Sequence, residues 1–110
     1  MSTLSTHVLD TALGRPAHGL RVRLEDGAGA ALGSGETDAE GRLADLGTSD
    51  APLRPGTFVL RFSVGDYFSS TGRPSLYTEI VIQFHITEWS EHYHIPLLLS
   101  PFGYSTYRGT

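Results

Sequence analysis

The side chains of this chain that are best suited to chemistry are histidines, an arginine and a polar C-terminal ending. His7 lies in an alternating segment near the N-terminus, Arg42 follows a turn, and His94 lies in a second alternating segment. Histidine is the only side chain whose unperturbed pKa lies near neutrality, so it can act as general base and then as general acid. An arginine fork can hold a planar, carbonyl-rich anion and the charge that develops on it.

The last four residues, 107–110, form an ending that is rich in ring, charge and hydroxyl groups: Tyr-Arg-Gly-Thr. They follow a segment that alternates from residue 92 and turns at 100–103. Terminal residues usually fray and tolerate change unless other contacts hold them. This composition therefore predicts that the terminus is part of a site.

The remaining histidines have simpler interpretations. His18 lies in a glycine-flanked turn and His85 on the polar face of a strand, so both are expected to be solvated. His92 and His94 share one strand face because side chains alternate with period two, and two imidazoles placed so can converge on a metal. A zinc site takes three or four ligands, and the chain has no cysteine. A metal site is the minor alternative, and none is predicted.

The composition excludes several classes of function. The net charge is −4, from 12 acidic and 8 basic residues, so no basic footprint for nucleic acid or an anionic membrane is present. The longest apolar run, 95–99, is too short to span a bilayer. The N-terminal residues carry no signal-peptide pattern, which leads us to expect a cytoplasmic protein. A chain of 110 residues fits one domain, 1–110, with a core of its own.

The elements that must position these side chains are short strands. Val, Ile, Phe, Tyr and Thr recur between Gly- and Pro-containing turns, which is typical of a sandwich or barrel, and we favour a β-sandwich. A turn at 38–41 is expected to deliver Arg42 to a short strand. One short helix is expected at 66–72, with Asp66 as N-cap and Gly72 at C′. Strands are predicted at 4–10, 20–24, 30–37, 57–64, 78–86, 92–99 and from 103 to the last residue.

Within these strands, the alternation also predicts which side chains face the core. Leu4, Thr6 and Val8 share one face of the first strand, and Ser5, His7 and Leu9 share the other. The core faces of two later strands are expected to be Phe58, Leu60, Phe62 and Val64, and Ile80, Ile82, Phe84 and Ile86. On this pattern His7 points away from the core of its own chain.

Taken singly, His7 is an ordinary exposed strand histidine and Arg42 an ordinary turn arginine. Taken with their surroundings, they lie in segments that resemble the transthyretin-like 5-hydroxyisourate hydrolases. The segments span nearly the whole chain in that family's order. A terminal Tyr-Arg-Gly-hydroxyl tetrapeptide separates these enzymes from transthyretin itself. The matching segments are STHVLDTA at 5–12, GRPA at 14–17, TDAEGR at 37–42, FSVGDYF at 62–68, HYHIPLLLSP at 92–101 and GYSTYRGT at 103–110.

The resemblance implies an all-β, transthyretin-like (prealbumin-like) sandwich of two sheets. It implies hydrolysis of 5-hydroxyisourate, after urate oxidation in purine degradation, to 2-oxo-4-hydroxy-4-carboxy-5-ureidoimidazoline. The family needs no cofactor. It is a homotetramer, a dimer of dimers, with active sites at the dimer–dimer interface. A small-molecule substrate is therefore the expected partner, without nucleic acid or membrane.

The resemblance also assigns residues. The family's catalytic positions fall on His7, Arg42, His94 and Thr110. Its substrate-binding positions fall on His7, Arg42, Tyr107, Arg108, Gly109 and Thr110. The family usually ends in serine, whereas this chain ends in threonine, which keeps the hydroxyl and adds a methyl group; activity is expected to survive.

The roles that the resemblance implies agree with the residue types. Amide hydrolysis needs an activated water, a stabilised oxyanion and a proton for the leaving nitrogen. His7 and His94 would activate water and relay the proton, and Arg42 would bind substrate and stabilise the oxyanion. Thr110 would position water or shuttle a proton, and Arg108 would orient the terminus or bind substrate. Which histidine is the general base stays open.

Two other functions compete with the hydrolase. The first is a transthyretin-type carrier with an apolar channel and no turnover, against which the 107–110 ending argues. The second is a generic immunoglobulin-like interaction module. It predicts a secreted protein, and the sequence shows no signal peptide.

Overall fold

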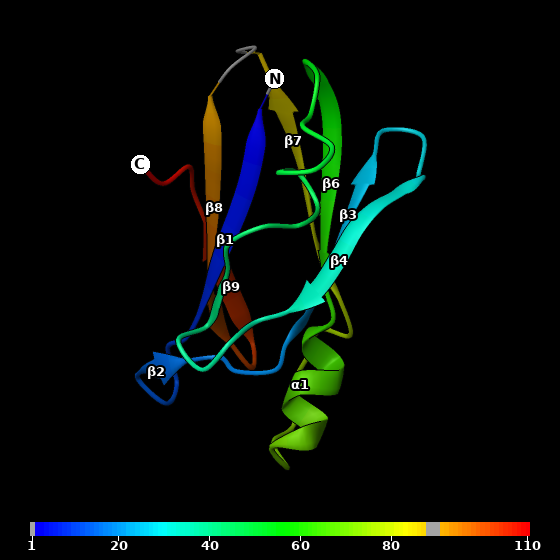
Figure 1. Cartoon of the computed structure of the whole chain (residues 1–110). Coiled ribbons are helices and arrows are strands. Elements are labelled where there is room, and N and C mark those ends of the chain that lie inside the picture. Colours follow the sequence, from blue (N-terminus) through cyan, green and yellow to red (C-terminus); the bar gives the residue numbers. More distant parts are fainter. Residues whose placement is uncertain (1, 88–90) are drawn as a thin grey trace.

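The chain folds into two β-sheets packed face to face, with one short helix at one end (Figure 1). The computed structural model describes residues 2–87 and 91–110. Within these ranges, no helix is long and apolar enough to cross a membrane. The elements are β1 (Thr3–Asp10), β2 (Arg15–Pro16), β3 (Arg21–Asp26), β4 (Ala31–Glu36), β5 (Arg42–Leu43), β6 (Gly56–Phe62), α1 (Val64–Ser70), β7 (Ile80–Ile86), β8 (His92–Ser100) and β9 (Gly103–Thr106).

The first sheet joins the two ends of the chain. Its strand order is β2-β1-β8-β9, with β5 also paired to β1, while the second sheet has the order β4-β3-β6-β7. β1 and β8 run parallel, and the other strand pairs are antiparallel. The parallel register places Ser5 beside His94 and His7 beside Pro96. Residues from opposite ends of the sequence therefore share one surface.

The core lies between the two sheets. Of the inward set predicted for 78–86, Ile80 and Ile86 are buried, whereas Ile82 and Phe84 are half-buried. In β1, Leu4 and Val8 are fully buried, and Thr6 is almost so. Apolar side chains of β6 meet those of β3 and β7 across the sheet, and the opposite layer comes from β8. The inward set predicted for 57–64 is confirmed, since all four of its members are buried: Phe58, Leu60, Phe62 and Val64.

The helix differs from its prediction at its start. It begins at Val64, with Ser63 as N-cap, so Val64 belongs to the helix and Asp66 lies in its first turn. A carboxylate there still interacts favourably with the helix dipole. The end is as predicted: Gly72 at C′ has φ 70°, and its N–H donates to the carbonyl of Ser69. That bond is part of a Schellman-type ending.

Other strand limits also differ from the expected ones. β3 extends through Asp26, beyond the predicted end at residue 24, and β7 begins at Ile80 and not at residue 78. β9 ends at Thr106, so the last four residues continue as a tail and not as a strand. The turn expected at 87–91 lies mostly outside the described residues.

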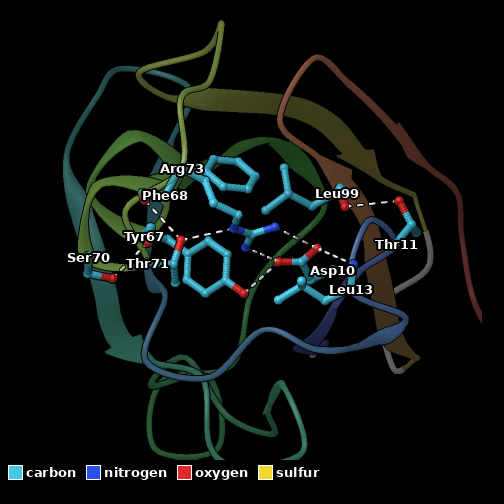
Figure 2. Close-up of polar contacts among 9 residues, drawn as sticks. All are labelled: Asp10, Thr11, Leu13, Tyr67, Phe68, Ser70, Thr71, Arg73 and Leu99. Atoms are coloured by element: carbon cyan, nitrogen blue, oxygen red, sulfur yellow. Dashed lines mark hydrogen bonds and ion pairs between the residues drawn. The ribbon is translucent and has the colours of Figure 1, made fainter.

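A buried polar cluster fixes the end of β1 to the helix (Figure 2). The Asp10 carboxylate, with no exposed surface, accepts hydrogen bonds from the Tyr67 hydroxyl at 2.8 Å and the Leu13 N–H at 3.1 Å, and it pairs with Arg73. Burial raises the pKa of Asp10, but the hydrogen bonds from Arg73, Tyr67 and Leu13 outweigh it and lower that pKa. Burial and the bond to Asp10 raise the pKa of Tyr67 to about 12. The cluster thus fixes the C-terminal end of β1 against the helix.

Candidate functional site

A pocket of about 270 Å³ opens on the outer face of the first sheet. Its wall combines β1, β5 and the segment that follows it, β8 and the C-terminal tail. The parallel pairing of β1 with β8 brings these segments together. The lining residues are Ser5, Thr6, Arg42, Ala44, His92, His94 and Thr110.

Arg42 is placed by the turn that precedes it. One carboxylate oxygen of Asp38 accepts hydrogen bonds from the N–H groups of Glu40 and Arg42, each at 2.9 Å. Gly41 has φ 75°, and a Cβ added there would lie 2.3 Å from the carbonyl oxygen of Val8. Only glycine therefore lets the turn lie this close to β1.

The side chain of Arg42 is exposed and available to a ligand. β5 pairs with β1 so that Arg42 stands opposite His7. Among residues 2–87 and 91–110, no carboxylate forms an ion pair with the Arg42 guanidinium. The pocket therefore carries a fixed positive charge that a carbonyl-rich or anionic ligand can neutralise.

His94 is half-buried and presents one free ring nitrogen. Its Nδ1 lies 2.8 Å from the Ser5 hydroxyl, while Nε2 has no hydrogen-bond partner in the described part of the chain. Burial is the main cause that lowers the pKa of His94, followed by the positive charges of His7, His92 and Arg42. A lowered pKa keeps this imidazole neutral at pH 7, the form that can accept a proton.

His7 lies beside the pocket and is not part of its wall in the single chain. Its Nε2 lies 2.8 Å from the backbone carbonyl of Glu40. Because a carbonyl only accepts, Nε2 must carry the hydrogen, and in the neutral ring Nδ1 is the acceptor. His7 thus fastens the turn that presents Arg42.

The C-terminal tail is held against β8, which places Thr110 in the pocket wall. The N–H of Gly109 donates to the carbonyl of His94 at 2.7 Å, and the Thr106 hydroxyl donates to the carbonyl of Pro96 at 2.7 Å. A Cβ added to Gly109 would lie 2.7 Å from Cδ2 of His94. The tail therefore packs directly on the imidazole of His94.

Residues 4–109 match the model of the HIUase/Transthyretin family. The chain belongs to this family. It is 46% identical to 5-hydroxyisourate hydrolase 2 of Rhizobium meliloti, over 97% of this chain and 95% of that protein. The structure of 5-hydroxyisourate hydrolase from Klebsiella pneumoniae is 44% identical, covers all of both chains and has a TM-score of 0.92. Transthyretin from Sparus aurata is 27% identical over 97% of this chain and 96% of its own, with a TM-score of 0.88.

The predicted two-sheet, transthyretin-like fold is confirmed by these comparisons and by the strand order. The pocket brings together four of the predicted site residues: Arg42, His94 and Thr110 line it, and Gly109 packs on the ring of His94. His7 stands at its edge.

Tyr107 and Arg108 do not reach this pocket within one chain. They line a second pocket of about 230 Å³ near the edges of β7, β8 and β9. The Arg108 guanidinium pairs with Glu91 at 2.9 Å and stands 4.2 Å from the centre of the Tyr93 ring. In the single chain these two residues therefore line a different pocket from Thr110.

The sequence analysis assigned no role to Ser5 and Thr3. The Ser5 hydroxyl lies 2.8 Å from Nε2 of His92, and the Thr3 hydroxyl lies 2.6 Å from Nδ1 of the same ring. The available signal was the alternation that places Ser5 on the same strand face as His7. In the described residues, no group of three or more His, Asp or Glu side chains is arranged to hold a metal.

Proposed function

We propose that this chain hydrolyses 5-hydroxyisourate, opening its six-membered ring at an amide to give 2-oxo-4-hydroxy-4-carboxy-5-ureidoimidazoline in urate degradation. The observation that carries the proposal is one pocket that joins the free Nε2 of His94 and the unpaired guanidinium of Arg42 to the C-terminal Thr110. Relatives that bear this enzyme's name cover nearly the whole chain. The substrate is planar and rich in carbonyl groups, which suits this polar wall.

The first step activates water. Nε2 of His94 takes a proton from a water molecule, whose oxygen attacks the ring carbonyl and forms a C–O bond. The negative charge that develops on the carbonyl oxygen is stabilised by Arg42. Removal of a comparable charge-stabilising donor costs about 100- to 1,000-fold in kcat.

The second step opens the ring. The C–N bond of the tetrahedral intermediate breaks, and the nitrogen keeps the electron pair. The His94 imidazolium returns its proton to that nitrogen, so protons balance and the histidine is neutral again. His7 is proposed to assist from the pocket edge, where its Nδ1 can accept a hydrogen bond from substrate or water.

Thr110 lines the pocket wall. We expect the hydroxyl to position the attacking water, and the additional methyl group of threonine to be tolerated because the side chain is exposed. Thr110→Ser should therefore retain turnover. Thr110→Val, which keeps the shape but lacks the hydroxyl, should lose it.

The assembly that we propose is a homotetramer, a dimer of dimers, with the pockets at the dimer–dimer interface. Its support is that Arg42, His92 and Thr110 are exposed in the single chain and leave the pocket open on one side. The proposed substrate contacts of Tyr107 and Arg108 depend on this assembly. Sedimentation analysis of the purified protein tests it, and a monomer would contradict it.

Cell fractionation tests the expected cytoplasmic location.

The decisive assay follows the ultraviolet absorbance of freshly generated 5-hydroxyisourate. Micromolar protein should accelerate its decay well beyond the spontaneous rate, and Arg42→Ala and His94→Ala should each remove most of the acceleration. Arg15→Ala is the matched control, because Arg15 is exposed on β2 outside the pocket. A wild-type protein that leaves the spontaneous decay unchanged would refute the hydrolase and favour a carrier.

A further inference from the structure

A continuous line of hydrogen bonds runs along the wall of the pocket. The Ser5 hydroxyl oxygen lies 2.8 Å from Nδ1 of His94 and 2.8 Å from Nε2 of His92. Nδ1 of His92 lies 2.6 Å from the Thr3 hydroxyl. The line therefore runs from Thr3 through His92 and Ser5 to His94, and it ends at the free Nε2 of His94.

This line is a consequence of strand register. The parallel pairing places Thr3 beside His92 and Ser5 beside His94. Alternate residues of a strand point to the same side, so all four side chains emerge on the outer face. Ser5 is the most enclosed of them, with an exposed fraction of 9%. A hydroxyl this enclosed needs partners, and the two imidazoles supply them.

We propose that Ser5 is a positioning residue that holds Nδ1 of His94 and so directs Nε2 of that ring to the pocket in the form that accepts a proton. His92 and Thr3 extend the line and set its direction. The kinetic part of this inference rests on the proposed hydrolase function. The hydrogen-bonding part stands independently of it.

The line has two head-to-tail directions, because a hydroxyl can donate one hydrogen bond and accept others, and a neutral imidazole donates one and accepts one. In the first direction, Thr3 donates to His92, His92 to Ser5, and Ser5 to Nδ1 of His94, which leaves a hydrogen on Nε2. In the second direction, Nδ1 of His94 donates to Ser5, Ser5 to His92, and His92 to Thr3. Nε2 of His94 then carries a lone pair.

Only the second direction suits a general base. When Nε2 of His94 accepts a proton, the ring becomes an imidazolium and must donate from Nδ1 as well. In the second direction Nδ1 already donates to Ser5, so no hydroxyl rotates when the proton arrives. A group arranged in advance for the charged state adds no reorganisation to the reaction barrier.

The surroundings of His94 agree with this arrangement. Burial and the positive charges of its neighbours lower the pKa of His94, so the ring is neutral before it receives a proton. A neutral ring has two tautomers, and the partner at Nδ1 decides between them. Among the described side chains, the Ser5 hydroxyl is the partner of that nitrogen, at 2.8 Å.

The direct test is long-range nitrogen–proton NMR of protein labelled with nitrogen-15 in its histidines. In the wild type, neutral His94 should show a protonated Nδ1 and an unprotonated Nε2. Ser5→Ala should shift the ring toward the Nε2–H tautomer, and Ser5→Thr, which keeps the hydroxyl, should restore the wild-type pattern. A wild-type ring in the Nε2–H form would overturn the inference whether or not the protein has hydrolase activity.

Steady-state kinetics supply the second readout. Ser5→Ala should lower kcat by about 10- to 100-fold, the range seen when an outer hydrogen-bond partner of a functional histidine is removed. KM should change little, and Ser5→Thr should recover most of the loss. The matched control is Ser105→Ala, because Ser105 is exposed on β9 of the same sheet outside the pocket.

The outcomes separate the two proposals. A Ser5→Ala variant with wild-type kcat would overturn the positioning role, and so would equal losses in Ser5→Ala and Ser5→Thr. Thermal unfolding checks that each variant is folded. If the wild type has no hydrolase activity, the proposed function fails, and the NMR comparison alone decides the role of Ser5.

Discussion

Replacement of Gly109 by alanine should disable the pocket without unfolding the chain. An added Cβ would lie 2.7 Å from Cδ2 of His94 and 3.4 Å from Cγ of both His94 and Pro96. Carbon atoms in contact normally lie about 3.5–4.0 Å apart. Either the imidazole of His94 or the C-terminal tail must therefore move by about 1 Å to make room.

Two hydrogen bonds resist that movement. One joins Nδ1 of His94 to Ser5 at 2.8 Å, and the other joins the Gly109 N–H to the His94 carbonyl at 2.7 Å. Whichever gives way, His94 and Thr110 no longer face the substrate together. A misplacement of about 1 Å costs about 100-fold in rate, equivalent to about 2.7 kcal/mol in activation free energy.

The effect on folding should be smaller. Among the described residues, Gly109 donates a backbone hydrogen bond to His94, and such a bond is worth about 0.5–1.5 kcal/mol net. For a domain of about 100 residues, a loss of 1 kcal/mol lowers the Tm by about 4–8 °C. Activity and stability should therefore separate in this variant.

The assay compares kcat/KM and Tm for Gly109→Ala and a matched control, Gly103→Ala. A Cβ at Gly103 would meet only the Ser100 hydroxyl oxygen, at an ordinary 3.7 Å, so this control should retain full activity. Wild-type kcat/KM in Gly109→Ala would refute the argument that the tail holds His94 in place. Equal losses in both variants would refute it as well.

Three further predictions concern stability, pH dependence and the tail. Asp10→Ala should lower the free energy of unfolding by about 3 kcal/mol, because it leaves the mostly buried charge of Arg73 unpaired; urea denaturation measures the loss. The pKa of Asp10 is lowered on folding, so wild-type stability should decrease as the pH falls below about 4, and the variant should show a weaker decrease, since Asp38 and Asp45 also have lowered pKa values. His92→Gln removes one of the charges that, after burial, lower the pKa of His94, so the acidic limb of kcat/KM should move to higher pH. Deletion of 107–110 should abolish turnover and leave the circular dichroism of the strands intact.

Each of these has a result that would contradict it. An Asp10→Ala variant as stable as wild type would show that the buried cluster adds nothing. An acidic limb unchanged in His92→Gln would mean that another group controls the pH dependence. A truncated chain with the wild-type rate would remove Thr110 from the site.

The strands were predictable because apolar alternation of period two needs only local sequence. The helix start was less so. Val64 continues the inward pattern of the strand before it, and a buried side chain fits either element. Asp66 and Ser63 are both good N-cap residues, and only the chain geometry selects Ser63. Alternation thus predicts which side chains are buried better than it predicts where an element ends.

The site was predictable to the extent that its residues lie in the family's segments, as Arg42 and His94 do. The contact between Ser5 and His94 was not, because these residues lie 89 positions apart and no local pattern specifies that their strands pair in parallel. The contacts of the Arg108 side chain could not be predicted either. Its pairing with Glu91 and Tyr93 depends on how the tail lies against the sheet.

The two catalytic candidates among the histidines differ because they face different residue types along one constant strand register. In the pairs Thr3–His92 and Ser5–His94, a hydroxyl of β1 faces an imidazole of β8. In the next pair on that face, His7 faces Pro96. Proline offers no hydrogen-bonding side chain, so His7 turns to the carbonyl of Glu40. That carbonyl can only accept, which fixes the hydrogen on Nε2 of His7. The partner of His94 is a hydroxyl that can either donate or accept. Each ring can keep its hydrogen bond when it is protonated. The difference is one of place, because His94 lines the pocket and burial lowers its pKa, whereas His7 stands at the pocket edge. The general base and acid of the reaction is accordingly expected to be His94, with His7 holding the turn and the substrate.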